Sequence, residues 1–140
     1  MFGLEIGREH HFSAEAIDKA TVLVVRRGAV VSIAERDCKA ARELWSFTGR
    51  ELHRVHEHSM LMVKSAQQRV ACFLLEMSER LAGEVIELPM SRQDIADYLG
   101  LTIETVSRTM TQLVCDHIIG LPSSRRIVLR NHRALRELNP

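Results

Sequence analysis

Aromatic side chains are scarce in this chain of 140 residues, because phenylalanine, tryptophan and tyrosine together make up only 4% of it. Apolar residues nevertheless account for 46% and charged residues for 26%. A disordered chain has a much lower apolar share, and a chain of this length can bury one modest core or two small ones. The sequence therefore predicts a folded protein with a mainly aliphatic core.

Cysteines and long apolar runs are also few. The three cysteines are odd in number and far apart, which favours reduced thiols over a disulfide framework. No stretch approaches the roughly 18 consecutive apolar residues of a membrane span, and the first residues lack the layout of a signal peptide. We therefore expect a cytoplasmic protein with no membrane partner.

A strong excess of charge of either sign is missing too, because the net charge is +1. Any binding to nucleic acid must then depend on a local concentration of charge. Residues 121–136 contain no acidic residue. Their cations are Arg125, Arg126, Arg130, Arg133 and Arg136. The C-terminal part is therefore where contact with phosphates is expected.

The start of the chain has the composition of β-strands. Residues 12–17 alternate in polarity, and residues 21–25 form a largely β-branched run that suits a buried strand. Two strands alone are marginal in water. We therefore predict that they belong to a larger β-structure extending before Met1.

Residues 35–63 contain no proline and a single glycine, Gly49, which predicts one long helix. Small or apolar residues recur along it at alternating spacings of four and three, namely Ala41, Trp45, Thr48, Leu52, Val55, Ser59 and Met62. We call these seven residues the seam. A repeat of about 3.5 residues is typical of a coiled coil, so a second copy of the helix is the predicted partner. A helix packed on its own domain is the alternative.

A second amphipathic segment follows at residues 66–83. Gly83 supplies a C-terminal stop, and a short extended piece comes next at residues 85–90. Cys72 lies within the apolar stripe of this segment and is expected to be buried. The stripe consists of Val70, Phe73, Leu74, Met77 and Leu81.

The stretch MSRQDIADYLGLTIETVSRTMTQL, residues 90–113, has the most specific pattern. Ser91 can cap a short helix, with Asp94 completing a weaker capping box, and Gly100 permits the positive φ of a tight turn. The inward face of this helix is expected to be Ile95, Ala96 and Leu99.

A second short helix should start after Thr102 and bury Val106, Met110 and Leu113. Ala96, Gly100 and Val106 meet the steric need of two helices that cross closely at a steep angle, which predicts a helix-turn-helix. An ordinary helical hairpin with a solvated polar face is the alternative.

The polar side of that second helix carries Glu104, Ser107 and Arg108. In DNA readers an arginine can bind guanine, and a carboxylate can accept from the cytosine amino group. Because a glutamate near phosphates costs affinity unless it reads a base, we predict that Glu104 and Arg108 contact DNA bases.

A β-hairpin is predicted directly afterwards, with strands at residues 117–121 and 127–129 and a turn built from Pro122, Ser123 and Ser124. Arg125 and Arg126 lie near its tip. A basic hairpin after a helix-turn-helix is a wing, and its arginines are suited to phosphates.

The motifs SRQDIADYLGLTIETVSR and RVACFLLEMSERL resemble the winged helix-turn-helix of the CRP/FNR transcription regulators, in their FixK-like branch. REHHFSAEAIDKATVLVV also resembles the last strands of that family's sensory β-roll. The resemblance implies a mainly α fold with small β elements. Residues 1–34 would be a remnant of the cyclic-nucleotide-binding-like β-roll, residues 35–63 a dimerisation helix, and residues 64–140 the winged helix-turn-helix DNA-binding domain.

The same resemblance implies a function, which is to activate or otherwise regulate transcription as a homodimer on TTGA-type palindromic half-sites. Glu104, Ser107 and Arg108 match the family's base-contacting positions. Double-stranded DNA and a second copy are the implied partners, and RNA polymerase is a further candidate. The positions that usually hold phosphates correspond to Arg92, Gln93, Thr102 and Thr105.

The sequence departs from the family at its ligand sites. Phe12 and Ser13 stand where cyclic-nucleotide-binding members have an arginine and a serine, so we expect no cyclic nucleotide. The cysteine-rich segment that holds an iron-sulfur cluster in FNR is absent, and three scattered cysteines cannot replace it. His53, His56 and Glu57 share a helix face without a further ligand group, so no cofactor and no metal is predicted.

Three alternatives stay open. Oxidation of Cys38, beside the seam, or of Cys115, just after the second helix, could control the protein. An enzyme would need reactive groups that converge on one pocket, and the sequence offers no such set. A truncated dimerisation module could titrate full-length regulators without binding DNA, but such a module has no reason to keep both Glu104 and Arg108.

Overall fold

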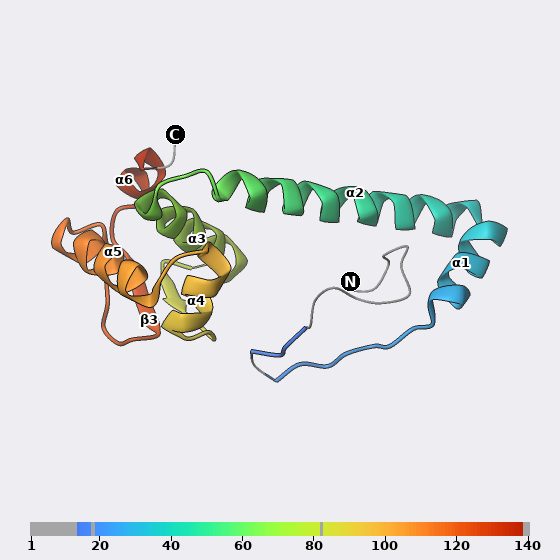
Figure 1. Ribbon diagram of the computed structural model, residues 1–140, viewed down its shortest axis with the longest axis horizontal. Coiled ribbons are helices and arrows are strands. Elements are labelled where there is room, and N and C mark those ends of the chain that lie inside the picture. The colour runs from blue at the N-terminus through green and yellow to red at the C-terminus, as the bar shows by residue number, and fades with distance from the viewer. Residues whose placement is uncertain (1–13, 18, 82, 139–140) are drawn as a thin grey trace. The chain divides into compact units, whose positions relative to one another are not determined.

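A computed structural model describes residues 14–17, 19–81 and 83–138 (Figure 1). The chain divides into two compact units, Met1–His56 and Glu57–Pro140. Among the described residues, no helix is both long and apolar enough to cross a membrane.

The strands predicted near the start do not form in the described part of that segment. Residues 21–25 have no regular structure, and Leu23 and Val24 are 88% and 89% exposed. A strand needs a paired neighbour to be stable, and no described segment pairs with these residues. The prediction is wrong for residues 14–17 and 21–25, whereas Phe12 and Ser13 lie outside the described residues. That residues 1–34 are a β-roll remnant stays a prediction.

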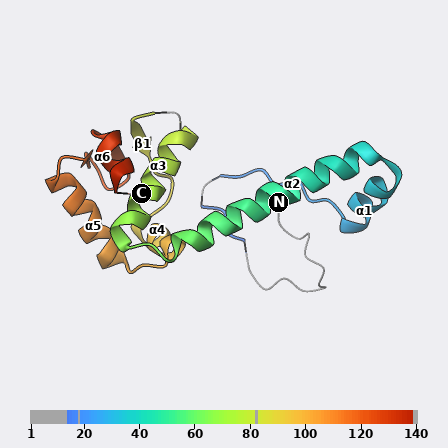
Figure 2. The same ribbon diagram turned by 90° about the horizontal axis from the view of Figure 1, so that it is seen from above.

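The predicted long helix is preceded by a separate one and is slightly shorter than expected. Helix α1 spans Arg27–Arg36 and helix α2 spans Cys38–Leu61. Asp37 separates them, because its backbone is extended and its carboxylate accepts from the backbone N–H of Lys39 at 2.8 Å. An aspartate in this position caps the start of a helix. From there α2 runs as one continuous ribbon (Figures 1 and 2).

The second unit is organised around helix α3, Ala66–Leu81. Val70, Phe73, Leu74 and Met77 are buried, which confirms most of the predicted stripe. Leu81 is a correction, because it is 49% exposed at the last residue of the helix, where the chain leaves the core.

Helices α4, Arg92–Leu99, and α5, Ile103–Cys115, form the predicted helix-turn-helix. The hydroxyl of Ser91 accepts from the N–H of Asp94 at 3.2 Å, and the Asp94 carboxylate accepts from the N–H of Ser91 at 2.7 Å. This confirms the capping box. The inward faces are also confirmed, because Ile95, Ala96, Leu99, Val106, Met110 and Leu113 are all buried.

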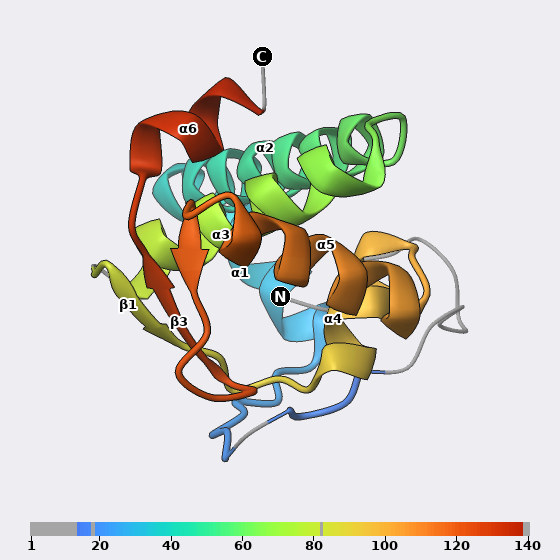
Figure 3. The same ribbon diagram turned by 90° about the vertical axis from the view of Figure 1, so that its left-hand side faces the viewer.

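A small antiparallel sheet completes the unit, with strand order β1-β3-β2 (Figure 3). Its strands are β1 Val85–Glu87, β2 Ile119–Gly120 and β3 Arg126–Leu129. Ile86 pairs with Ile127, and Ile119 pairs with Leu129. All four of these residues are buried. The predicted hairpin is thus confirmed, with a shorter first strand. The extended piece predicted at residues 85–90 contains β1, which is the remaining strand of the sheet.

Helix α6, His132–Glu137, was not predicted. Its start is capped by Asn131, whose side-chain oxygen accepts from the N–H of Ala134 at 3.0 Å. Leu135 is fully buried and anchors the helix on the core.

Candidate nucleic-acid interface

Helix α5 has one face fixed in the core and one face free. Val106, Met110 and Leu113 are at most 1% exposed, so the rotation of the helix about its axis is set by packing. Glu104, Ser107 and Arg108 therefore point outward, and all three are exposed. Helix α5 lies on the outside of its unit and faces the viewer in Figure 3.

The turn before α5 depends on glycine. Gly100 has φ 59°, in the left-handed region that favours glycine, and Leu101 N–H donates to the Ala96 carbonyl at 2.9 Å. A Cβ at Gly100 would lie 3.2 Å from Met62 Sδ. The backbone conformation thus calls for glycine here, and Met62 would have to shift slightly to admit a Cβ.

Glu104 is held in its charged form at the start of α5. Hydrogen bonds from its own backbone N–H and from the Thr102 hydroxyl lower the pKa of its carboxyl, and Arg108 adds a smaller favourable charge. Because Thr102 is the N-cap of α5, the carboxylate lies at the helix end where negative charge is stabilised. The exposed face therefore presents an anion and, one turn later, a cation.

The residues expected to hold phosphates differ in exposure. Arg92 and Thr105 are half-buried, whereas the other four, Gln93, Thr102, Arg125 and Arg126, are exposed. Arg92 Nη1 lies 2.9 Å from Met110 Sδ, and burial lowers the pKa of its guanidinium. Arg92 thus helps to pack α4 against α5. Gln93 Nε2 donates to Asp97 Oδ1 at 2.8 Å on the surface of α4.

The backbone of the wing is held by hydrogen bonds at its turn, where the arginine side chains are exposed. The Ser123 hydroxyl accepts from the N–H of Arg126 at 3.1 Å, and the carbonyl of Arg125 accepts from the N–H of Leu88 at 2.8 Å. The side chains of both arginines remain exposed. The pKa of Asp94 is lowered mainly by its bonds to Ser91 and to a smaller extent by Arg125.

Two features of this site were not found from the sequence. Arg69 of α3 donates to the carbonyls of Leu99 and Gly100 in the turn of the helix-turn-helix. His117 has φ 58° and ends α5, with Ile118 N–H donating to the Leu113 carbonyl at 3.0 Å. A left-handed residue in this position is usually glycine, so no sequence pattern pointed to histidine.

The seam is largely exposed. Helix α2 contains no buried residue, and Trp45 and Leu52 are 81% and 69% exposed. Ala41 and Met62 are half-buried, whereas Thr48, Val55 and Ser59 are exposed. Thr48 satisfies its hydroxyl within the helix, on the Leu44 carbonyl at 2.9 Å. Apolar side chains of this size mark a surface that an interaction can bury.

The thiols and the histidines form no reactive cluster in the part of the chain that is described. Cys38 and Cys115 are exposed, and Cys72 is half-buried rather than fully buried. Burial raises the pKa of the Cys72 thiol, although Lys64 Nζ lies 3.9 Å from its sulfur. No three His, Cys, Asp or Glu side chains among the described residues lie close enough to hold a metal ion.

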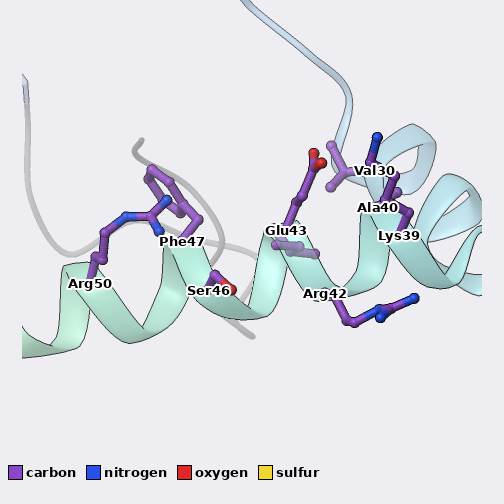
Figure 4. A pocket seen from close by; sticks show the side chains of 9 residues that line it. Val30, Lys39, Ala40, Arg42, Glu43, Ser46, Phe47 and Arg50 are labelled. Carbon is purple, nitrogen blue, oxygen red and sulfur yellow. The ribbon is translucent and has the colours of Figure 1, made fainter.

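An open pocket lies in the first unit along the start of α2 (Figure 4). Arg50 and Phe47 stand at one end of it, with the guanidinium 6.0 Å from the ring centroid. Lys39 and Glu43 lie nearer the other end. Its lining contains neither histidine nor cysteine.

Two helices that meet at a tight turn, followed by a β-hairpin with a basic loop, define a winged helix-turn-helix domain. A family model described as the Crp-like helix-turn-helix domain matches residues 68–138. The chain belongs to the CRP/FNR family of transcription regulators, in its FixK-like branch.

Similar proteins include the nitrogen fixation regulation proteins FixK of Azorhizobium caulinodans and Rhizobium meliloti. They are 48% and 42% identical to this chain, each over 99% of its length. The chain spans 58% and 63% of the two relatives. The structure of FixK2 from Bradyrhizobium japonicum is 47% identical with a TM-score of 0.77, over 83% of this chain and 60% of that one.

Proposed function

We propose that this chain is a sequence-specific DNA-binding transcription regulator that reads TTGA-type palindromic half-sites as a homodimer. The observation that carries the proposal is the face of α5. Three buried residues fix the helix on the core, which leaves Glu104, Ser107 and Arg108 on its exposed side near its start. The first residues of a recognition helix are those that reach base edges in the major groove.

The charges on that face support base reading over general attraction to DNA. Arg108 can donate two hydrogen bonds to a guanine, and Glu104 can accept from the amino group of a cytosine. A carboxylate that is already anionic would be repelled by phosphates, so it contributes to binding only where it meets a donor on a base. Ser107, one turn after the start of α5, can serve either as donor or as acceptor.

The remaining polar groups suit the DNA backbone. Thr102 and Gln93 are exposed at the starts of α5 and α4, and Arg125 and Arg126 are exposed on the wing. Phosphate contacts from helix starts and arginines fix the register of a protein on the duplex without reading its sequence. Arg92 would have to leave Met110 to join them, because its guanidinium lies on that sulfur.

A dimer would double the readout, because two recognition helices related by a two-fold axis fit a palindrome. The exposed apolar side chains of Trp45 and Leu52 on α2 support such an assembly. A coiled-coil pairing of this seam would remove them from water. RNA polymerase is a candidate partner of the assembled regulator.

The test is a titration of the full chain against a duplex with two TTGA half-sites in a palindrome, at one fixed salt concentration. We expect binding of the palindrome that is about a thousandfold tighter than binding of a scrambled duplex. Equal affinity for both duplexes would contradict sequence-specific reading. A dimer that binds neither duplex would instead favour the dimerisation module that titrates other regulators.

A further inference from the structure

Arg69, in the first turn of α3, holds two separate pieces of chain together. Its Nε donates to the Lys64 carbonyl at 2.9 Å, and its Nη2 donates to the Met62 carbonyl. Its Nη1 donates to the carbonyls of Leu99 and Gly100 at 3.0 and 3.3 Å. One guanidinium therefore joins the segment just after α2 to the turn between α4 and α5.

These acceptors explain why a guanidinium suits the position. Leu99 is the last residue of α4, and Met62 directly follows the last residue of α2. Carbonyls at the end of a helix and directly after it have no partner within the helix, and they lie at the negative end of its dipole. A planar cation with donors in a fixed fork can serve two such ends at once, whereas an ammonium group cannot span them in the same way.

Two further contacts join the same pieces of chain. The His58 and Tyr98 rings lie 4.8 Å apart between α2 and α4. Met62 Sδ approaches the site where Gly100 lacks a side chain. Ser59 and Met62 are the last residues of the seam, and both belong to the compact unit that contains the helix-turn-helix. The end of the seam is thus fixed directly against the turn that precedes α5.

We propose that Arg69 is a positioning residue that orients the recognition helix with respect to the end of the seam, Ser59 and Met62, which lies in the same unit, and thereby sets the spacing of half-sites that the dimer accepts. This inference rests on the proposed function. Arg69 touches no base in this role, because its donors are used on main-chain carbonyls. It acts by reducing the freedom of each α5 relative to the end of its own seam.

The first arm of the test measures DNA binding by Arg69→Met, Arg69→Lys and the unsubstituted chain. The duplexes carry one half-site, the palindrome, and palindromes with the spacer changed by one or two base pairs. We expect Arg69→Met to keep its affinity for a single half-site. The ratio of its affinity for the palindrome to its affinity for one half-site should fall about tenfold, because a less firmly oriented second recognition helix has a lower effective concentration at the second half-site. Its preference for one spacer should flatten.

Two comparisons separate geometry from charge and from stability. Arg69→Lys keeps the charge but not the fork, so it should behave like Arg69→Met. Arg80→Met is the matched control, since Arg80 lies on the same helix and pairs with Glu76 at 2.6 Å on its surface. It should leave the spacer preference unchanged. A uniform loss on every duplex, or full recovery with lysine, would overturn the positioning role.

The second arm needs no DNA. Trypsin cuts after Lys64, in the segment between α2 and α3. Because the Lys64 carbonyl accepts a hydrogen bond from Arg69, this segment must open locally before it is cut. We expect cleavage at Lys64, followed by mass spectrometry, to be about tenfold faster in both Arg69 variants than in Arg80→Met. Equal cleavage rates would show that Arg69 does not hold this segment in place. A further outcome is that the unsubstituted chain binds no palindrome while the Arg69 variants are still cleaved faster at Lys64. That outcome would contradict the proposed DNA-binding function. It would leave Arg69 as a residue that holds residues 62–64 against the helix-turn-helix, without a role in half-site spacing.

Discussion

Helices α2 and α3 are neighbours in sequence with opposite relations to the rest of the chain. Both are amphipathic by sequence, yet α3 buries six of its 16 residues and α2 buries none of its 24. Phe73 of α3 is 1% exposed, whereas Trp45 of α2 is 81% exposed. The apolar face of α3 is buried within its own chain, whereas α2 contains no buried residue in the part of the chain that the structure describes.

An apolar stripe therefore identifies a face that can be buried but not the surface that covers it. The spacing of the residues carries part of the missing information. The seam repeats at about 3.5 residues, as in paired helices, whereas a helix on a globular core needs only a broader stripe. Substitutions on the two helices should therefore differ sharply in their effects.

Removing a large side chain from α3 should have the strongest effect. Phe73→Ala creates a cavity in the core and should lower the free energy of unfolding by about 3 to 5 kcal/mol. Urea unfolding followed by circular dichroism measures it. Trp45→Ala on α2 is the matched truncation, and at low concentration, where the chain is monomeric, it should change stability by less than about 1 kcal/mol. Comparable losses in both variants would break the contrast between the helices.

Placing charge in the seam should separate the copies without unfolding the chain. Leu52→Lys with Val55→Lys would bury two cations in an apolar interface, a cost that should abolish the dimer. Sedimentation equilibrium should give half the mass of the unsubstituted chain. The control, Ser46→Lys with His53→Lys, adds the same lysines to α2 outside the seam and should remain dimeric. An unchanged mass in the seam variant would reject the interface.

The wing extends the comparison to a surface whose exposed groups are charged. Arg125→Ala with Arg126→Ala should weaken binding to specific and random duplexes alike and leave folding intact. The slope of log affinity against log salt should fall by about one for each phosphate contact that is lost. Arg80→Ala is the control for a lost surface arginine. A loss confined to the palindrome would mean that the wing reads bases.

The smallest effect concerns the start of α4. The Ser91 hydroxyl and N–H hold the pKa of the Asp94 carboxyl below its ordinary 3.8. A lowered pKa in the folded state stabilises the protein above the ordinary value and loses that contribution as pH falls through the lowered one. Asp94→Asn should therefore be less stable near pH 7, with a difference that shrinks below about pH 4. Glu79→Gln, an exposed carboxyl on α3, should show no such difference in thermal unfolding.

The helix-turn-helix was predictable because each of its local signals agrees with its tertiary structure. Ser91 caps, Gly100 turns, and the residues at helical spacing are those that are buried. Local preference and packing that point the same way make a sequence readable. The end of α5 shows the opposite case, since His117 adopts the conformation that Gly100 adopts, without glycine's signal.

The less readable parts depend on contacts that are remote in sequence or not formed. Arg69 donates to carbonyls 30 and 31 residues away. Every residue has a main-chain carbonyl, so the sequence does not indicate which residues accept these bonds. Residues 21–25 have the β-branched composition of a strand, but a strand forms only with a neighbour. Asp37 was a local signal that the prediction of one long helix overlooked. This single capping residue separates α1 from α2 although the composition of the segment is helical throughout.

Base reading depends on the exposed face of α5, and one ratio of affinities tests it. The affinities of Glu104→Gln and Arg108→Ala for the palindrome and for a scrambled duplex are measured at one salt concentration. Glutamine keeps the shape of Glu104 while removing its charge, so binding to the scrambled duplex should strengthen slightly as the preference for the palindrome falls. Arg108→Ala should weaken both, and each base contact should account for about 1 to 3 kcal/mol of discrimination. If Glu104→Gln leaves the ratio of palindrome to scrambled affinity unchanged, Glu104 is an ordinary residue at the start of a helix and base reading by this face is contradicted.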